Sequence, residues 1–77
     1  MTRKVFHSVP APTGWKVESN GRTVSNHRTQ ATSEAAAVAL GHKAQNAGSL
    51  GQAVLHKSDG KIREERTYGA DPRKTPG

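Results

Sequence analysis

Histidine is the residue whose spacing tests most directly for metal or acid–base chemistry in this sequence. The chain has four, at His7, His27, His42 and His56. No two have the i, i+3 or i, i+4 spacing that places two ligands on one helix face, so no helical metal pair is predicted. His7 and His56 fall in segments expected to be strands and can meet across a sheet. We expect them to be hydrogen-bonded structural residues, with no metal and no other cofactor.

The carboxylates and small polar residues give no catalytic pattern. Glu64 and Glu65 are adjacent in a predicted strand, so their side chains face opposite sides and cannot act as an acid–base pair. Asp59 is explained by an Asp-Gly turn. No serine lies in a nucleophile motif, and the glycines at 48 and 51 follow the predicted helix, whereas a phosphate-binding loop precedes one. We therefore expect neither an enzyme nor a small-molecule substrate.

Basic residues are the strongest functional signal. The 77 residues include twelve Lys and Arg against six Asp and Glu, a net charge of +6, which favours an anionic partner. If Ile62 packs against the helix, Lys61 and Arg63 project into solvent, on the sheet face that Lys16 and Arg22 can share. Such a face would bind the phosphates of DNA or RNA. The predicted nucleic-acid-binding residues are Lys16, Arg22, Lys57, Lys61, Arg63 and Arg66.

Two other interpretations stay open. The charges from Arg63 to Arg66 can equally form a solvated edge whose ion pairs contribute about 0–1 kcal/mol each. Because a chain this short buries little surface, it can also gain stability as a homodimer or as a regulator bound to a host protein. Trp15, the single tryptophan, is expected to anchor the core, whereas Tyr68 suits either the core or an exposed contact.

Composition limits the size of the core. Hydrophobic residues make up 31% of the chain, and Leu, Ile, Val and Phe together number eleven. This excludes a deep enclosed pocket and is typical of disorder unless the order of residues indicates structure. With no cysteine and no apolar run of membrane-spanning length, we expect a cytoplasmic protein with no membrane partner. A single domain over residues 5–70 is expected between flexible ends at 1–4 and 71–77.

Three strands are predicted in the first third of the chain. Residues 5–10, 15–19 and 22–26 alternate side chains at the strand period. Prolines and Gly14 mark the first turn, and Asn20-Gly21 predicts a type I′ hairpin at the second. Trp15 and Val17 are expected to face the core.

An Ala-rich helix is predicted from Ser33 to about Ala47. Thr32 is the expected N-cap, and Gly48 is expected to take the left-handed conformation that ends many helices. Gly41 costs about 1 kcal/mol relative to alanine, but its small size would let the helix lie close to a sheet. The predicted packing stripe is Ala36, Leu40, Ala44 and Ala47.

A second hairpin is predicted at the C-terminal side. Residues 51–57 and 61–68 are expected to be strands joined by the tight turn Ser58-Asp59-Gly60, the last of them a charged edge strand. The order strand, strand, strand, helix, strand, strand predicts the α+β class: one antiparallel sheet with a single helix packed on one face. Because turns, caps and periodicity agree with one another, a folded domain is favoured over a disordered chain.

Several short motifs recur in a known pattern. They are His7-Ser8-Val9-Pro10, Gly14-Trp15-Lys16-Val17, Leu55-His56, Asp59-Gly60, Ile62-Arg63-Glu64 and Tyr68-Gly69-Ala70-Asp71-Pro72. Over most of residues 5–72 the sequence resembles the small bacterial family known as domain of unknown function 2188 (DUF2188). One departure is the helix opening, where the family's usual Thr-x-x-Glu is shortened to Thr32-Ser33-Glu34. The resemblance implies a fold and a bacterial or phage context. It implies no activity, so it assigns no functional residue.

Overall fold

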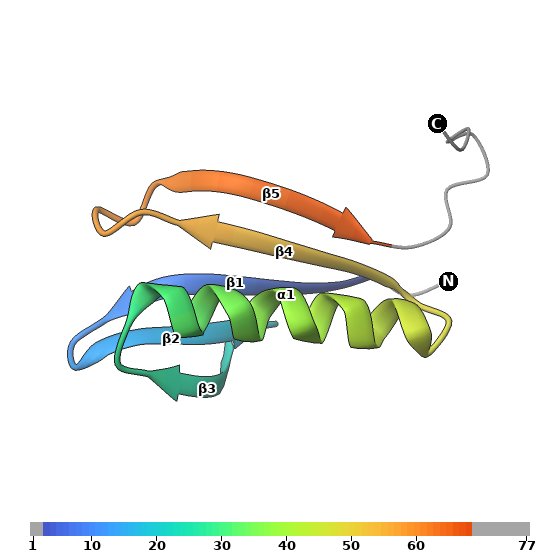
Figure 1. The fold of residues 1–77 in the computed structure, drawn as a ribbon, viewed down its shortest axis with the longest axis horizontal. Coiled ribbons are helices and arrows are strands. Elements are labelled where there is room, and N and C mark those ends of the chain that lie inside the picture. The colour runs from blue at the N-terminus through green and yellow to red at the C-terminus, as the bar shows by residue number, and fades with distance from the viewer. Residues whose placement is uncertain (1–2, 69–77) are drawn as a thin grey trace.

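The computed structural model describes residues 3–68, which form five strands and one helix (Figure 1). In chain order these are β1 (Arg3–Ala11), β2 (Gly14–Ser19), β3 (Arg22–His27), α1 (Gln30–Asn46), β4 (Leu50–His56) and β5 (Ile62–Tyr68). Every predicted strand and the helix are therefore present, in the predicted order. The tail predicted to be flexible, residues 71–77, lies outside the described residues.

The five strands form one sheet in the order β3-β2-β1-β4-β5. The pairs β1–β2, β2–β3 and β4–β5 are antiparallel, but β1 and β4 are parallel. The prediction of a purely antiparallel sheet is therefore wrong: the sheet is mixed. The physical reason is the helix, whose 17 residues span about 25 Å. It carries the chain back along the sheet, so that β4 runs in the direction of β1, as a parallel pair requires.

The helix begins earlier than predicted. Thr29, with φ −126° and ψ 157°, is the N-cap, and its Oγ1 accepts a hydrogen bond from the Thr32 backbone N–H at 3.2 Å. The prediction of Thr32 as N-cap is thus wrong, because Thr32 lies in the first turn and its hydroxyl donates to the Thr29 carbonyl. The other end agrees with the sequence: Gly48 has φ +89°, and its N–H donates to the Gln45 carbonyl.

Small residues bring α1 onto the sheet. The buried helix residues are Ser33, Ala37, Gly41 and Ala44, so the packing stripe lies one position from the predicted one and shares only Ala44 with it. At the closest approach, Gly41 lies directly over Gly51 of β4, where a Cβ on either glycine would collide with its surroundings. The expectation that Gly41 permits a close helix is confirmed.

The core lies between α1 and one face of the sheet, and Figure 1 looks onto this helix-covered face. Its buried hydrophobic residues there are Phe6, Val17, Ala37, Ala44, Ala53 and Leu55. Among them is a hydroxyl pair, in which Ser8 and Ser33 are fully buried and their Oγ atoms lie 2.8 Å apart. Ser33 Oγ also donates to the Lys16 carbonyl at 3.2 Å, which ties the helix to β2 through polar contacts.

Candidate functional site

The face of the sheet opposite α1 is hereafter called the open face, because no described element covers it. Alternation puts Val5, His7 and Val9 of β1 on this face, since Phe6 and Ser8 point to the helix. The neighbouring strands add Lys16 and Glu18 from β2, Val24 from β3, Gln52, Val54 and His56 from β4, and Ile62 and Glu65 from β5. Val24 and Ile62 are 47% and 53% exposed, which makes this the face on which large apolar side chains meet solvent.

A hollow of about 800 Å³ lies over the first part of β1 and the β2–β3 hairpin. Its apolar lining includes Val5, Val9 and Val24, and its polar lining includes His7, His56 and Glu18. Arg3 and Lys4 border it where β1 begins. The hollow is a shallow, solvent-open depression and not an enclosed cavity, in agreement with the small core expected from composition.

His7 and His56 meet across the β1–β4 pair, as their strand positions suggested. His7 Nδ1 lies 3.1 Å from His56 Nε2, and His56 Nδ1 lies 2.9 Å from the Gly60 carbonyl oxygen. Because a carbonyl only accepts, His56 carries its proton on Nδ1, and its Nε2 accepts from His7 Nδ1–H. Burial, followed by the neighbouring His56, lowers the pKa of His7 below its ordinary value of 6.5.

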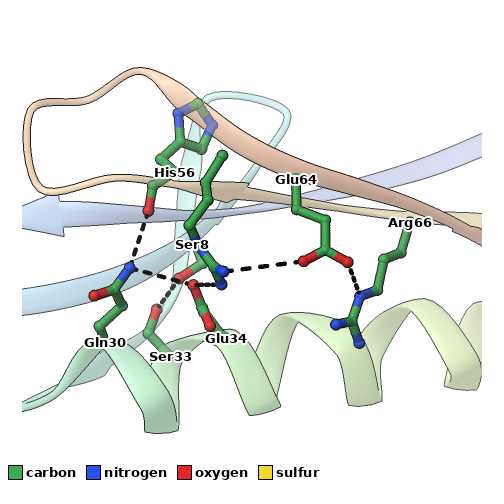
Figure 2. A network of polar contacts seen from close by, with 8 residues as sticks. Ser8, Gln30, Ser33, Glu34, His56, Glu64 and Arg66 are labelled. Atoms are coloured by element: carbon green, nitrogen blue, oxygen red, sulfur yellow. Dashed lines mark hydrogen bonds and ion pairs between the residues drawn. The ribbon is translucent and has the colours of Figure 1, made fainter.

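Two of the six predicted nucleic-acid-binding residues are held in a network on the helix side of β5 (Figure 2). Arg63 Nη2 donates to Glu34 Oε2 at 2.5 Å, and Arg66 Nε donates to Glu64 Oε2 at 2.7 Å. This bond to Arg66 lowers the pKa of Glu64. Gln30 joins the network through Glu34 and the His56 carbonyl.

The expectation that Ile62 packs against the helix is wrong, and so is the placement of Arg63 on the solvent face with Lys16. Opposite Leu55 and His56 the β4–β5 register shifts, so that Ile62 pairs with His56 and Arg63 is the extra residue. A one-residue shift moves side chains to the other face of a strand. Arg63 therefore turns towards α1, while Lys16 stays on the open face and pairs with Glu18 at 2.9 Å.

The other three predicted residues, Arg22, Lys57 and Lys61, are exposed and have no ion pair within residues 3–68. They lie at opposite ends of the sheet: Arg22 follows the β2–β3 turn near the start of β1, and Lys57 and Lys61 flank the β4–β5 turn. The predicted basic residues therefore do not form one continuous surface. The sequence reasoning did not identify Val24 and Ile62 as exposed; the scarcity of apolar partners in their strands was the available signal.

The aromatic residues lie on the helix side. Phe6 is 9% exposed, Trp15 is half-buried on the same face as Val17, and Tyr68 is half-buried. The Tyr68 ring covers Gly41, with its centroid 4.1 Å from that of His42. Phe, Trp and Tyr thus offer no stacking platform on the open face of the described residues. Within residues 3–68 there is also no cluster of three or more His, Cys, Asp or Glu at metal-binding distances.

These features define a class: a small α+β domain in which one helix covers one face of a mixed five-stranded sheet and leaves the other face open. The family model described as "Uncharacterized protein conserved in bacteria (DUF2188)" matches residues 6–68. The chain therefore belongs to this family, and the resemblance drawn from its motifs is confirmed. The comparison with curated proteins found no match, and the comparison with solved structures found none. Among the described residues, α1 is too short and too polar to cross a membrane.

Proposed function

We propose that this protein is a non-enzymatic, cytoplasmic module that binds an acidic partner protein on its open face. The observation that carries the proposal is the exposed Val24, which lines a broad hollow on this face together with Val5 and Val9. Ile62 adds a second exposed apolar side chain on the opposite edge strand of the same face. Exposed apolar side chains around a depression are typical of protein-interaction surfaces.

The charges around this face support an acidic partner over a second copy of the chain. Arg3, Lys4 and Arg22 lie at one end of the face, Lys57 and Lys61 lie at the other, and all five are exposed. The acidic residues on the face are already engaged, Glu18 with Lys16 and Glu65 with Gln52. The unbalanced charge is positive, so a partner with an apolar centre and an acidic rim complements it, whereas two copies would repel each other.

The size of the face is sufficient for such a complex. The domain measures 40 Å by 22 Å along its two longer axes, which bounds the face at on the order of 900 Å², close to the roughly 800 Å² that each partner buries in a standard interface.

Nucleic acid is the second candidate, favoured by Arg22, Lys57 and Lys61, which form no ion pair within residues 3–68. These residues could contact phosphates at two separated points of a duplex, with little sequence selectivity. Single-stranded recognition is less well supported, because the described part of the open face presents no Phe, Trp or Tyr ring on which bases can stack.

The deciding experiment is site-specific photo-crosslinking in the bacterium that encodes the protein. A photoreactive phenylalanine is placed at Val24 or Ile62 on the open face, and at the exposed Ala39 of α1 as the control. We expect both open-face positions to crosslink to the same acidic protein and the helix position not to do so. Purified partner must then bind the wild-type protein, and Val24→Asp must weaken that binding at least about tenfold, as expected when a charge replaces an apolar residue that lines the contacted hollow.

The electrostatic part is tested with matched charge variants of the same purified pair. Arg22→Ser should weaken binding and reduce its dependence on salt, whereas Lys43→Ser on the helix should not. A crosslink pattern shared by helix and sheet positions would refute the proposal. Binding of a 20-base-pair DNA or RNA duplex at about 50 mM salt, lost in Lys57→Ser with Lys61→Ser, would replace it with the nucleic-acid alternative.

A further inference from the structure

The two histidines on the open face have the arrangement of a metal chelate. His7 Nδ1 and His56 Nε2 lie 3.1 Å apart, both rings line the hollow, and neither residue is fully buried. We propose that His7 and His56 bind a divalent transition metal ion of the class that prefers imidazole, such as Zn²⁺ or Ni²⁺. This inference does not depend on the proposed partner protein.

The distance between the two nitrogens fits such an ion. With zinc–nitrogen bonds of 2.0–2.1 Å, two ligands of a tetrahedral site are separated by about 3.3–3.4 Å. The nitrogens therefore need to move apart by only a few tenths of an ångström, and each ring must also tilt, because the ion lies to one side of the line that joins them. The His7 proton shifts from Nδ1 to Nε2, so that both ligands stay neutral and no proton is released.

The surroundings of His56 already have the form found around metal ligands. Its Nδ1–H donates to the Gly60 carbonyl at 2.9 Å, which fixes the tautomer and points the Nε2 lone pair at His7. Ligating histidines commonly donate their second N–H to a backbone carbonyl in this way.

The remaining coordination positions face the solvent of the hollow. Glu18 is the cross-strand partner of His7, and the negative charges of Glu18 and Glu65 act on His7. Lys16 is the cation nearest to this group through its ion pair with Glu18. Water molecules would complete the sphere, while Glu18 stays paired with Lys16 and adds negative charge nearby. With two histidines as its fixed ligands, the site should bind more weakly than a four-ligand structural zinc site.

The inference is tested by titrating the purified protein with zinc sulfate and, separately, nickel sulfate. Calorimetry at pH 7.5 should give one ion per chain, and binding should weaken at pH 5.5, where protons compete for the imidazoles. His7→Gln and His56→Gln should each weaken zinc binding about tenfold or more, whereas His27→Gln, which removes a half-buried histidine elsewhere, should not. Circular dichroism establishes that each variant is folded.

A second measurement needs no variant. In the wild-type protein, zinc should shift the ring nitrogen signals of His7 Nδ1 and His56 Nε2, and paramagnetic Ni²⁺ should broaden the amides of Val54 and Glu18 before those of α1. The inference is overturned if 1 mM zinc leaves these signals unchanged, if all four histidines respond equally, or if both glutamine variants bind zinc as the wild type does.

Discussion

Replacing Gly51 by alanine tests the contact that joins the helix to the sheet. A Cβ at this position would overlap the Gly41 carbonyl oxygen and lie 2.9 Å from the carbonyl carbon and 3.0 Å from Cα of the same residue. These are backbone atoms that no rotamer change can move, so α1 must rise by about 1 Å to reach normal contact, forfeiting roughly half of each dispersion contact across the gap. Overpacking of this kind costs about 1–3 kcal/mol. We expect about 3 kcal/mol here, because the contacts between α1 and the sheet beneath it all loosen when the helix rises.

That loss is large for a domain of this size. Sixty-six described residues imply a total stability of about 3–10 kcal/mol, and each kcal/mol corresponds to about 4–8 °C in Tm. Gly51→Ala should therefore lower Tm by at least about 12 °C, measured by circular dichroism and by urea unfolding. Gly51 does not have a positive φ, so without the contact the substitution would stabilise the protein by about 0.4–1 kcal/mol through the unfolded state. Whether Tm falls or rises therefore tests whether Gly51 is in close contact with Gly41.

Two comparisons separate the contact from other effects of a methyl group. Gly21→Ala has no atom within 4 Å of its new Cβ but has φ +74°, so it should cost only the roughly 1–2 kcal/mol of the left-handed conformation. Gly41→Ala would place its Cβ 2.7 Å from the Tyr68 ring, and its penalty should shrink in a Tyr68→Ala background. A Gly51→Ala protein that melts within about 2 °C of the wild type would refute the close approach.

Three further predictions concern the buried serine hydroxyls, the pKa of His7 and the ion pair between Glu34 and Arg63. Ser33→Ala should cost about 2–3 kcal/mol in urea unfolding, because it removes both hydrogen bonds of Ser33 Oγ and leaves the buried Ser8 hydroxyl unpaired, while Ser8→Ala should cost only about 1 kcal/mol; equal costs would contradict the hydrogen-bond directions. Because the folded pKa of His7 is lowered, the unfolded chain binds its proton at higher pH. Stability should therefore be full above about pH 6.5 and fall as the pH drops through the folded pKa, with a smaller slope in His7→Gln; identical slopes would show that His7 is not responsible. Glu34→Gln breaks the exposed ion pair with Arg63 and should change Tm by less than about 6 °C, so a larger fall would reveal a structural role for the network.

Turn residues and strand alternation predicted most of the fold, because each of these features depends on residues that are adjacent in the sequence. Asn20 and Gly21 have φ +56° and +74°, as a type I′ turn requires, and Val17 is fully buried, as its alternation indicated. The direction of β4 is not a local property, since it depends on where α1 delivers the chain. One signal was nevertheless present: Ala53, Val54 and Leu55 form a continuous apolar run, and all three are buried, as is typical of a central strand in a parallel pair.

The candidate site was harder to predict, because a one-residue shift in the pairing of β4 with β5 decides which β5 side chains lie on the open face. The turn between β4 and β5 has the Lys57 N–H donating to the Lys61 carbonyl, with Gly60 at φ +88°. A three-residue loop of this kind carries a bulge at its left-handed residue, but a second register shift, opposite Leu55 and His56, leaves Arg63 as the extra residue and changes which side chains reach the open face. The meeting of His7 and His56 could be anticipated from their strands, but its 3.1 Å separation required the parallel register of β1 and β4.

The central position of β1 also determines the order in which the protein can fold during synthesis. β1 is made first, yet its parallel partner begins with Leu50 opposite Arg3, 47 residues later in the chain. Until the ribosome has released β4, β1 has one unpaired edge and α1 has no Gly51 against which to pack. Such long-range pairing slows folding relative to a helical protein of the same size. A nascent chain that ends before residue 50 should therefore remain unfolded and exposed to proteases, however well its first hairpins are encoded.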